Sequence, residues 1–523
     1  GCHLPHSGWI AVPFGRCRMI AAPGDSIVVT LADEAETILF GEDLVLALKA
    51  GDCLALSGDL GAGKSTLARA FLRAMADQDD LEVPSPTFTL AQIYDLRVPV
   101  VHFDLYRLAD PSELDELGFD EALSSGICLV EWPEMGGDLL PADRITLTLE
   151  HETIGRRATI TAPEAALARI RRVIAIREFL RANGHANGRR RFLTGDASMR
   201  AYETVLSESG ETVILMDWPK RPEGPPVLDG KPYPKVAHIA EDAYPFVAIS
   251  DYLRGIGLCA PEVLAVDYDQ GILLIENLGQ DGVLDEDGQP IGERYRESVV
   301  ALAYLHGHEI LQDLPVAGSS THHIPDFDPV AMKMEARLLL DWYLPWKRGG
   351  QAGEDEREEY LSIWDGLIAE LGSAEKNLLL RDFHSPNIIW RSQASGVHQV
   401  GLIDFQDAMI GPTAYDLASL VQDARVDIPK VLADQMMIDY LTLRRALGGF
   451  DEAGFLKSWA IMAAQRNCKL AGLWVRLRER DGKPHYMKHM PRTLRHLSTA
   501  LAHEALAPLR DWCHRAGIEL PES

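Results

Sequence analysis

Short apolar runs alternate with stretches of helical spacing over residues 25–162. The runs at 53–57, 100–103 and 127–130 have the length and the continuous apolar character of buried strands. Residues 66–75 instead repeat their apolar positions at helical intervals. The pattern therefore predicts an α/β domain in the N-terminal part of the chain.

Residues 163–191 have the composition of a junction between domains. An Ala/Arg-rich stretch of helical character leads into the breaker-rich sequence Asn183-Gly-His-Ala-Asn-Gly188. We expect a helical linker that ends in the arginine run Arg189-Arg-Arg191. Short basic runs beside linkers are usually solvated, and we expect the same of this one.

The remaining residues divide by their periodicity into two parts. Residues 192–280 are rich in strand patterns with one helix expected near 245–255, whereas residues 281–523 are dominated by helical periodicity. This order predicts a small sheet lobe followed by a larger helical lobe.

Composition adds limits to this picture. A chain of 523 residues exceeds what one hydrophobic core usually supports, which agrees with several domains. The contents of 46% hydrophobic and 25% charged residues are those of ordinary globular proteins. A net charge of -27 disfavours strong direct binding to a nucleic acid, so we expect any such role to run through partner proteins.

Cellular location is addressed by two further features. No apolar run approaches the roughly 20 residues that cross a bilayer, so we expect no membrane span. The seven cysteines include no C-x-x-C pair, which disfavours zinc and disulfide frameworks and favours a reducing cytoplasm. Residues 1–24 precede the periodic pattern, and we expect them to be disordered or an extension before a start at Met19.

A phosphate-binding motif follows the first predicted strand. Gly58-Asp-Leu-Gly-Ala-Gly-Lys-Ser-Thr66 matches G-x-x-x-x-G-K-[ST] between a strand and a helix. Its glycines let backbone N–H groups surround phosphate oxygens, the lysine neutralises them, and the hydroxyl can ligate Mg²⁺. The predicted nucleotide-binding residues are Gly58, Gly61, Ala62, Gly63, Lys64, Ser65 and Thr66, with Ser65 also a predicted metal ligand.

Two carboxylates end the next predicted strands. Asp104 follows residues 100–103, and Glu131 follows residues 127–130. A P-loop site needs a carboxylate on a neighbouring strand to hold the metal or orient water. We therefore predict that both residues are catalytic acids, with Asp104 also on the metal.

These motifs together carry a family resemblance. With Ser85-Pro-Thr-Phe-Thr-Leu90, His102-Phe-Asp-Leu-Tyr-Arg-Leu108 and Leu129-Val-Glu-Trp-Pro-Glu134, residues 25–160 resemble TsaE, the bacterial ATPase of tRNA N6-threonylcarbamoyladenosine synthesis. The resemblance implies a switch-like loop at Thr87 and a nucleotide-site role for Trp132. It also implies the other subunits of the threonylcarbamoyl transferase complex as partners, with ATP hydrolysis resetting that complex.

A second catalytic pattern lies far downstream. In Leu379-Leu-Arg-Asp-Phe-His-Ser-Pro-Asn387 an Asn follows an Asp by five positions, and an apolar run then ends at Asp404. This order is typical of a kinase catalytic loop. Asp382 would orient and deprotonate an acceptor hydroxyl, while Asn387 and Asp404 would ligate Mg²⁺ beside the ATP phosphates.

The N-terminal half of this second module is less regular. Its loop, which includes Ser198 and Arg200, has one glycine instead of G-x-G-x-x-G, and Met216 stands where protein kinases have a phosphate-binding Lys. Arg200, Lys220 or another base must then meet the phosphates. Glu276 and Leu278 lie in the expected hinge, where backbone groups would meet adenine.

These departures are themselves informative. Gly195-Asp-Ala-Ser-Met-Arg200, Leu215-Met-Asp-Trp-Pro219, the catalytic loop, Ile403-Asp-Phe-Gln-Asp407 and Gly411-Pro-Thr-Ala-Tyr-Asp416 together resemble the aminoglycoside-phosphotransferase-like family over about residues 175–515. The similarity is greatest to its N-acetylmuramate/N-acetylglucosamine kinase branch. It implies a small amino-sugar substrate and a two-lobed kinase-like fold.

Positive charge gathers in one later helical stretch that includes Arg466 and Lys469. A solvated helix face explains such a stretch in most proteins. Alternatively, Arg466 or Lys469 faces the acceptor and pairs with a substrate carboxylate.

The combined prediction is a bifunctional, cytoplasmic enzyme that uses ATP and Mg²⁺ at two sites. An α/β P-loop ATPase is followed by a two-lobed, kinase-like (α+β) phosphotransferase. The missing Lys leaves the alternative that the second module is a pseudokinase scaffold. A further alternative is that the first module is a nucleotide-dependent switch. The retained acids Asp104, Glu131, Asp382 and Asp404 favour catalysis in both modules.

Overall fold

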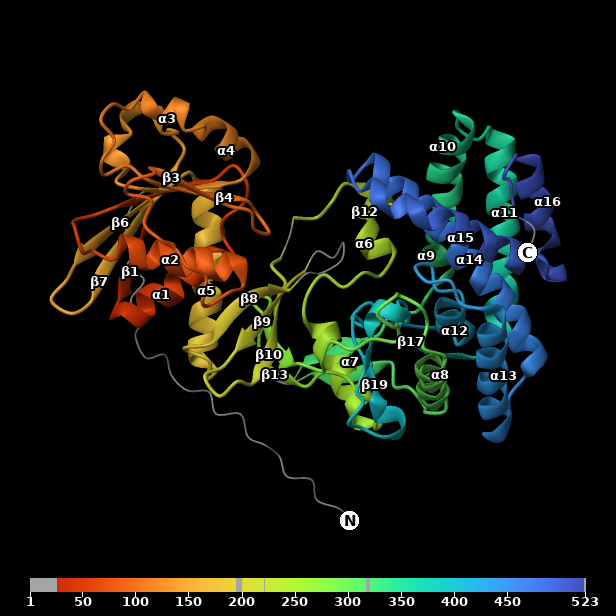
Figure 1. Cartoon of the computed structure of the whole chain (residues 1–523). Helices are drawn as coiled ribbons and strands as arrows, with labels where there is room; N and C mark the ends of the chain where they lie inside the picture. Colours follow the sequence, from red (N-terminus) through yellow and green to blue (C-terminus); the bar gives the residue numbers. More distant parts are fainter. Residues whose placement is uncertain (1–25, 194–199, 221, 317–319, 522–523) are drawn as a thin grey trace, which may run out of the picture. The chain divides into compact units, whose positions relative to one another are not determined.

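The computed structural model describes residues 26–193, 200–220, 222–316 and 320–521 (Figure 1). The chain divides by its packing into two units, one up to Met216 and one from Asp217. The segment predicted to be disordered, residues 1–24, and the candidate Ser198 lie outside the described residues. Within the described ranges, no helix has both the length and the apolar character that a bilayer crossing requires.

A seven-stranded sheet forms the centre of the first unit and confirms the α/β prediction. Its strand order is β1-β7-β6-β2-β5-β4-β3, and β2 pairs in parallel with both β5 and β6. Strands β4 and β5 are also parallel, with Asp104 opposite Glu131. The strands are β1 Ser26–Leu31, β2 Cys53–Ser57, β3 Ala91–Tyr94, β4 Val100–Asp104, β5 Ile127–Glu131, β6 Ile145–His151 and β7 Arg156–Thr161.

The phosphate-loop motif has the local context that the sequence predicts. Strand β2 is buried over its first four residues, and helix α2, Lys64–Ala76, begins within the motif. Because β2, β4 and β5 are parallel, their carboxyl ends lie at one edge of the sheet. That edge carries the loop, Asp104 and Glu131. The other helices of this part are α1 Glu34–Leu44, α3 Glu113–Glu116 and α4 Phe119–Ser125.

The predicted linker helix is present as α5, Glu164–Ala182. Its apolar side chains, including Leu167 and Ile170, lie in the same hydrophobic core as Leu54 and Phe71. Strands β8, Arg189–Leu193, and β9, Ala201–Leu206, follow as an antiparallel pair. The division at Met216 therefore lies beyond the junction at 163–191, and the predicted domain ranges stay a prediction.

The expectation that the arginine run is solvated was wrong. Arg190 is 1% exposed and forms two hydrogen bonds to Glu203, at 2.7 and 2.9 Å. Arg189 pairs with Glu42 at 2.8 Å, and Arg191 pairs with Asp77 at 2.9 Å. All three arginines neutralise carboxylates, which explains how this run is accommodated in a packed region.

Helices dominate the second unit after a short set of strands. Strands β13 and β14 form an antiparallel pair, and β18 and β19 form another. The final residue of β10, Thr212–Asp217, begins this unit. Its strands are β11 Pro226–Leu228, β12 Lys231–Pro232, β13 Val263–Asp267, β14 Ile272–Glu276, β15 Asp313–Val316, β16 Ser320–His323, β17 Lys376–Leu379, β18 Ile388–Trp390, β19 Val400–Leu402 and β20 Met409–Pro412.

The expected helix near residues 245–255 is confirmed as α7, Tyr244–Gly255. Helical periodicity after residue 281 is confirmed as well. Besides α7, the second unit contains one short helix before residue 281, α6 Tyr233–Val236. The helices after residue 281 are α8 Gly292–His306, α9 Pro329–Leu338, α10 Leu344–Arg348, α11 Glu354–Glu370, α12 Ala414–Val421, α13 Lys430–Ala446, α14 Glu452–Glu479, α15 Met490–Leu501 and α16 Ala507–Arg515.

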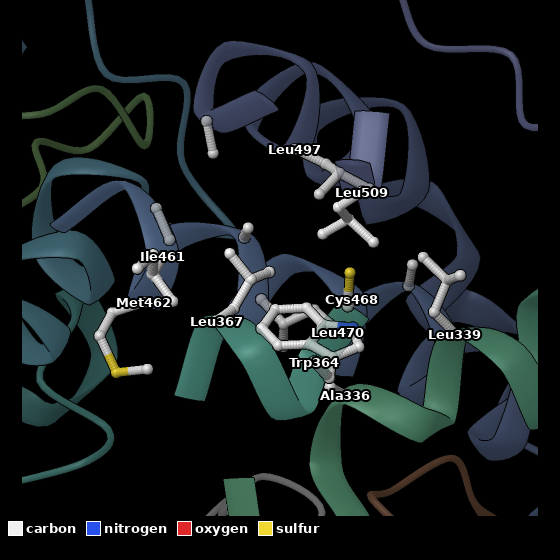
Figure 2. Close-up of a cluster of buried hydrophobic side chains, with 14 of the residues drawn as sticks. Ala336, Leu339, Trp364, Leu367, Ile461, Met462, Cys468, Leu470, Leu497 and Leu509 are labelled. Carbon is white, nitrogen blue, oxygen red and sulfur yellow. The ribbon is translucent and has the colours of Figure 1, made fainter. Parts of the chain in front are cut away.

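Helix α14 supplies much of the core of this helical region. Figure 2 shows Trp364 of α11 among Leu367, Cys468 and Leu470, and Leu497 and Leu509 belong to the same buried cluster. Arg466 and Asn467 of α14 are buried too. A helix that is buried on most sides has no broad polar face, so its few charged side chains must find partners inside the protein.

Candidate active sites

Glycine is required at the start of the phosphate loop. Gly58 has a φ of 134°, and a Cβ there would lie 2.3 Å from the Leu149 carbonyl oxygen. Gly61 and Gly63 also have positive φ, at 81° and 107°. These conformations turn the backbone into the N terminus of α2, where free N–H groups and the helix dipole favour an anion.

Lys64 lies against the loop and the predicted nucleotide-site tryptophan. Its Nζ donates to the carbonyl oxygens of Gly58 and Asp59, at 2.6 and 3.0 Å, and lies 3.7 Å from the centre of the Trp132 ring. Burial lowers the pKa of Lys64, while nearby carboxylates, Glu131 first, act in the opposite direction. The ammonium group is thus placed at the phosphate loop, as the motif predicts.

A hydrogen-bond chain joins the loop to the end of β5. Ser65 Oγ donates to Glu131 Oε2 at 2.8 Å, and His102 Nε2 lies 3.0 Å from Glu131 Oε1. The side chains of His102 and Glu131 are each 2% exposed. Glu131 is therefore the carboxylate adjacent to the hydroxyl that the motif assigns to the metal.

Asp104 instead contacts the loop that carries the predicted switch residue. Ser85 Oγ donates to Asp104 Oδ2 at 2.6 Å, and Ser85 Oγ lies 3.1 Å from Thr87 Oγ1. The Tyr106 backbone N–H donates to Asp104 Oδ1 at 3.1 Å. Both acids lie at one sheet edge, but they contact different partners.

Arg156 is a residue that the sequence analysis missed. A Cβ on Gly63 would lie 3.1 Å from Arg156 Nε, so the guanidinium lies directly against the phosphate loop. Its Nη1 donates to Thr37 Oγ1 at 2.9 Å, and its buried Nε has no hydrogen-bond partner in the described part of the chain. A second cation beside the loop adds to the positive potential there. A lone Arg at the start of β7 gives no sequence signal.

The catalytic loop of the second site is anchored from helix α12. Asp416 is fully buried and accepts the backbone N–H groups of Leu380 and Arg381, at 2.6 and 3.0 Å. Arg381 has a φ of 70° and donates to Glu335 Oε1 at 2.5 Å. These bonds fix the backbone on the N-terminal side of Asp382.

The predicted metal ligands of the second site lie together. Asn387 Nδ2 donates to the Asp382 carbonyl oxygen at 2.9 Å and to Asp404 Oδ2 at 3.3 Å. Gln406 Nε2 donates to Asp404 Oδ1 at 2.9 Å. The loop and the end of the β18–β19 hairpin thus bring the side chains of Asn387 and Asp404 together beside the backbone of Asp382.

Arg466 and Lys469 reach the same region from α14. Arg466 Nη1 lies 4.0 Å from Asp382 Oδ1, whereas Lys469 Nζ pairs with buried Glu335 at 2.8 Å. The Asp382 side chain is 37% exposed. Burial raises the pKa of Asp382, but the nearby cations, Lys469 first, outweigh this and hold the pKa at about 2. Asp382 is therefore an ionised acceptor at neutral pH.

The candidate hinge lies against the strand pair that leads to Asp404. Glu276 ends β14, and its carboxylate accepts the Glu262 N–H at 3.1 Å. The Leu278 side chain would be 3.0 Å from a Cβ on Gly401 in β19. Lys220 is exposed, and the roles of Arg200, Glu276 and Leu278 at the nucleotide stay predictions.

Two comparisons with protein families agree with this geometry. The family "Threonylcarbamoyl adenosine biosynthesis protein TsaE" matches residues 31–159, and the "Phosphotransferase enzyme family" matches residues 189–452.

Individual relatives give the same division. A TsaE protein of Haemophilus influenzae is 36% identical over 145 residues, which are 26% of this chain and 90% of the relative. An N-acetylmuramate/N-acetylglucosamine kinase of Caulobacter vibrioides is 33% identical over 355 residues, 64% of this chain and 94% of the relative. A kinase with the same name from Neisseria meningitidis is 30% identical over 324 residues, 61% of this chain and 87% of the relative.

The fold and the sites define a P-loop ATPase joined to a kinase-like phosphotransferase. The chain belongs to the TsaE family over residues 31–159 and to the phosphotransferase enzyme family over residues 189–452. It is a bifunctional enzyme that uses ATP at both sites.

Proposed function

We propose that the ATPase module supports N6-threonylcarbamoyladenosine modification at position 37 of tRNA, together with the other subunits of the bacterial threonylcarbamoyl transferase complex. The coverage of a named TsaE relative over 90% of its length supports this role. Contact with tRNA then runs through those subunits, because a net charge of -27 opposes direct binding. The absence of a C-x-x-C pair supports the reducing cytoplasm as the location.

We propose Mg²⁺ at both sites. The donor sets consist of hydroxyl, carboxylate and amide oxygens, which Mg²⁺ prefers, and phosphates and water complete its coordination. In the described ranges, no group of three His, Cys, Asp or Glu residues has the geometry of a metal site. When bound, Mg²⁺ would neutralise developing charge on the transferred phosphoryl group.

At the first site, we propose that Ser65 and Glu131 hold Mg²⁺ and that Asp104 orients the attacking water. The Ser65–Glu131 hydrogen bond of 2.8 Å carries this division of roles. Asp104 is instead connected through Ser85 to the loop at Thr87, where a switch residue would sense the γ-phosphate. The predicted contact of Asp104 with the metal therefore becomes the less favoured of its two roles.

Lys64→Ala is expected to weaken nucleotide binding at the first site roughly tenfold to hundredfold, because the loop loses a charge-assisted contact to the phosphates. Phosphotransfer by the second module should persist. Growth complementation of a TsaE-deficient strain and nucleotide titration measure the two sides of this prediction. Lys49→Ala, an exposed lysine before β2, is the matched control. Normal complementation by Lys64→Ala would argue against the proposed role.

For the second module we propose phosphotransfer from ATP to a hydroxyl of an N-acetylated amino sugar. Two kinases named for N-acetylmuramate and N-acetylglucosamine align over 94% and 87% of their lengths. Asp382 would accept the hydrogen bond of the acceptor hydroxyl and take its proton, while Asn387 and Asp404 would hold Mg²⁺. The contact of Asn387 with Asp404 and with the backbone of Asp382 disfavours a pseudokinase scaffold.

We further propose that Arg466 or Lys469 recognises the carboxylate of an acidic sugar. Arg466 is the stronger candidate, because its buried Nε has no hydrogen-bond partner in the described residues, whereas Lys469 is paired with Glu335. A guanidinium that is buried near Asp382 and incompletely bonded can donate to a carboxylate without losing an existing partner.

Arg466→Gln or Lys469→Gln is therefore expected to raise the KM for N-acetylmuramate roughly tenfold to hundredfold more than the KM for N-acetylglucosamine, which has no carboxylate. Steady-state kinetics with both sugars measure the ratio, and general damage to the fold cancels in it. Lys457→Gln, at a partly exposed position of the same helix where Lys457 pairs with Glu370, should leave the ratio unchanged. Equal losses for both sugars would assign a structural role to the tested side chain.

A further inference from the structure

His102 lies at the centre of the ATPase site although no motif assigns it a role. It is the third residue of β4 and lies two positions before Asp104, so both side chains are on the same face of the strand. Its imidazole nevertheless contacts Glu131 of β5, with Nε2 at 3.0 Å from Oε1. Asp104 is bonded to Ser85 and Tyr106 instead.

The surroundings of the imidazole determine its tautomer. The Nδ1 atom is buried and has no hydrogen-bond partner in the described residues. A proton on this nitrogen would leave a buried donor unsatisfied, whereas Nε2 faces a carboxylate that can only accept. The neutral ring therefore carries its proton on Nε2 and donates to Glu131.

Within the described ranges, two side-chain hydrogen bonds hold the carboxylate of Glu131. Its Oε2 accepts from Ser65, and its Oε1 accepts from His102. A Glu side chain has three rotatable bonds, and a buried carboxylate with one oxygen unpaired would rotate or recruit water. The imidazole, by contrast, is a rigid ring on a short side chain, and it is buried.

We propose that His102 is a positioning residue of the ATPase site and holds the Glu131 carboxylate in the orientation that faces Ser65 and the metal. The inference rests on the proposed place of Glu131 beside the metal. His102 acts through Glu131 and has no direct contact with nucleotide. It contributes by fixing the orientation of the Glu131 carboxylate before the nucleotide phosphates bind.

Three substitutions in the full chain separate hydrogen bonding from shape. The amide nitrogen of Gln in His102→Gln can reach the place of Nε2, whereas the shorter Asn in His102→Asn reaches only that of Nδ1. His102→Phe keeps the ring but has no donor. Two quantities are measured for each variant: ATPase kcat, and the gain in ADP affinity when Mg²⁺ replaces EDTA.

The proposal predicts that His102→Gln stays within about threefold of the unchanged protein in both quantities. His102→Asn and His102→Phe should lose roughly tenfold to hundredfold in kcat and most of the Mg²⁺ gain. Their ADP affinity in EDTA should change little, because the phosphate loop and Lys64 are untouched. Phosphotransfer activity of the same chain checks that each variant is folded.

The opposite results would overturn the inference. Retention of the Mg²⁺ gain by His102→Phe would show that the donor is dispensable, and equal losses in His102→Gln and His102→Phe would show that ring shape matters instead. Loss of ADP binding in EDTA would place His102 in the support of the loop. In a Glu131→Ala background, His102→Phe should have no further effect on the Mg²⁺ gain.

The same background separates this inference from the function on which it rests. A full Mg²⁺ gain in Glu131→Ala alone would refute the proposed place of Glu131. A lost gain in Glu131→Ala together with unchanged behaviour of His102→Asn and His102→Phe would refute only the role of His102.

Discussion

Asp382→Asn is expected to lower the kcat of phosphotransfer by a factor of about 10²–10⁴, the usual contribution of a general base. The substitution keeps the size of the side chain but removes the charge that would accept the acceptor proton. Cations around Asp382 hold its pKa at about 2, so the wild-type residue is ionised throughout the physiological range. Binding of Mg·ATP should persist, because Asn387 and Asp404 remain.

Rapid-quench or coupled assays of sugar phosphorylation measure the loss in kcat, and nucleotide titration measures the retained binding. ATPase activity of the first module in the same preparation controls for general damage. Asp434→Asn removes the charge of an exposed carboxylate on α13 and should leave all three readouts unchanged. Phosphotransfer near the wild-type rate in Asp382→Asn would exclude Asp382 as the base.

Local signals explain why the phosphate loop could be predicted from sequence. Gly58 and Gly63 have backbone conformations that few other residues adopt, and the adjoining strand and helix lie within 20 residues of them. The residues that the phosphate loop requires are therefore consecutive in the sequence. The kinase loop is similar, since Asn387 bonds to the carbonyl oxygen of Asp382 five positions earlier and to Asp404 across one hairpin.

The arginine run shows what such signals omit. Arg189 meets Glu42, 147 positions earlier, and Arg191 meets Asp77, 114 positions earlier. A basic run looks the same in a sequence whether it faces water or distant carboxylates. Only the packing of α5 and β8 within the first unit decides between these environments.

His102 and Arg156 show the limit of sequence-based prediction within the ATPase site. The spacing of His102 and Asp104 places both on one face of a strand, so the sequence could have suggested His102 as a site residue. It could not have shown that the imidazole contacts Glu131 of the next strand, since this depends on the register of β4 with β5. Arg156 belongs to β7, which lies on the other side of β2 from β4 and β5. Its guanidinium contacts Gly63, and no spacing rule connects these two residues.

Substitution of Asp404 is expected to have the second large effect on phosphotransfer. Its backbone has a φ of 61°, and its two oxygens accept hydrogen bonds from Asn387 and Gln406. These two amide donors orient the carboxylate toward the site of Asn387. Oriented carboxylate oxygens are the ligands that Mg²⁺ prefers.

Asp404→Ala is accordingly expected to reduce phosphotransfer by a factor of about 10³, because a metal contributes several kcal/mol of charge stabilisation and this substitution removes its carboxylate ligand. The defect should differ in kind from that of Asp382→Asn. Raising Mg²⁺ should recover part of the activity in Asp404→Ala, since Asn387 still offers an oxygen, but none in Asp382→Asn. Initial rates over a Mg²⁺ series at saturating sugar measure this contrast. Equal responses of the two variants to Mg²⁺ would contradict the assignment of Asp404 to the metal and of Asp382 to the acceptor hydroxyl.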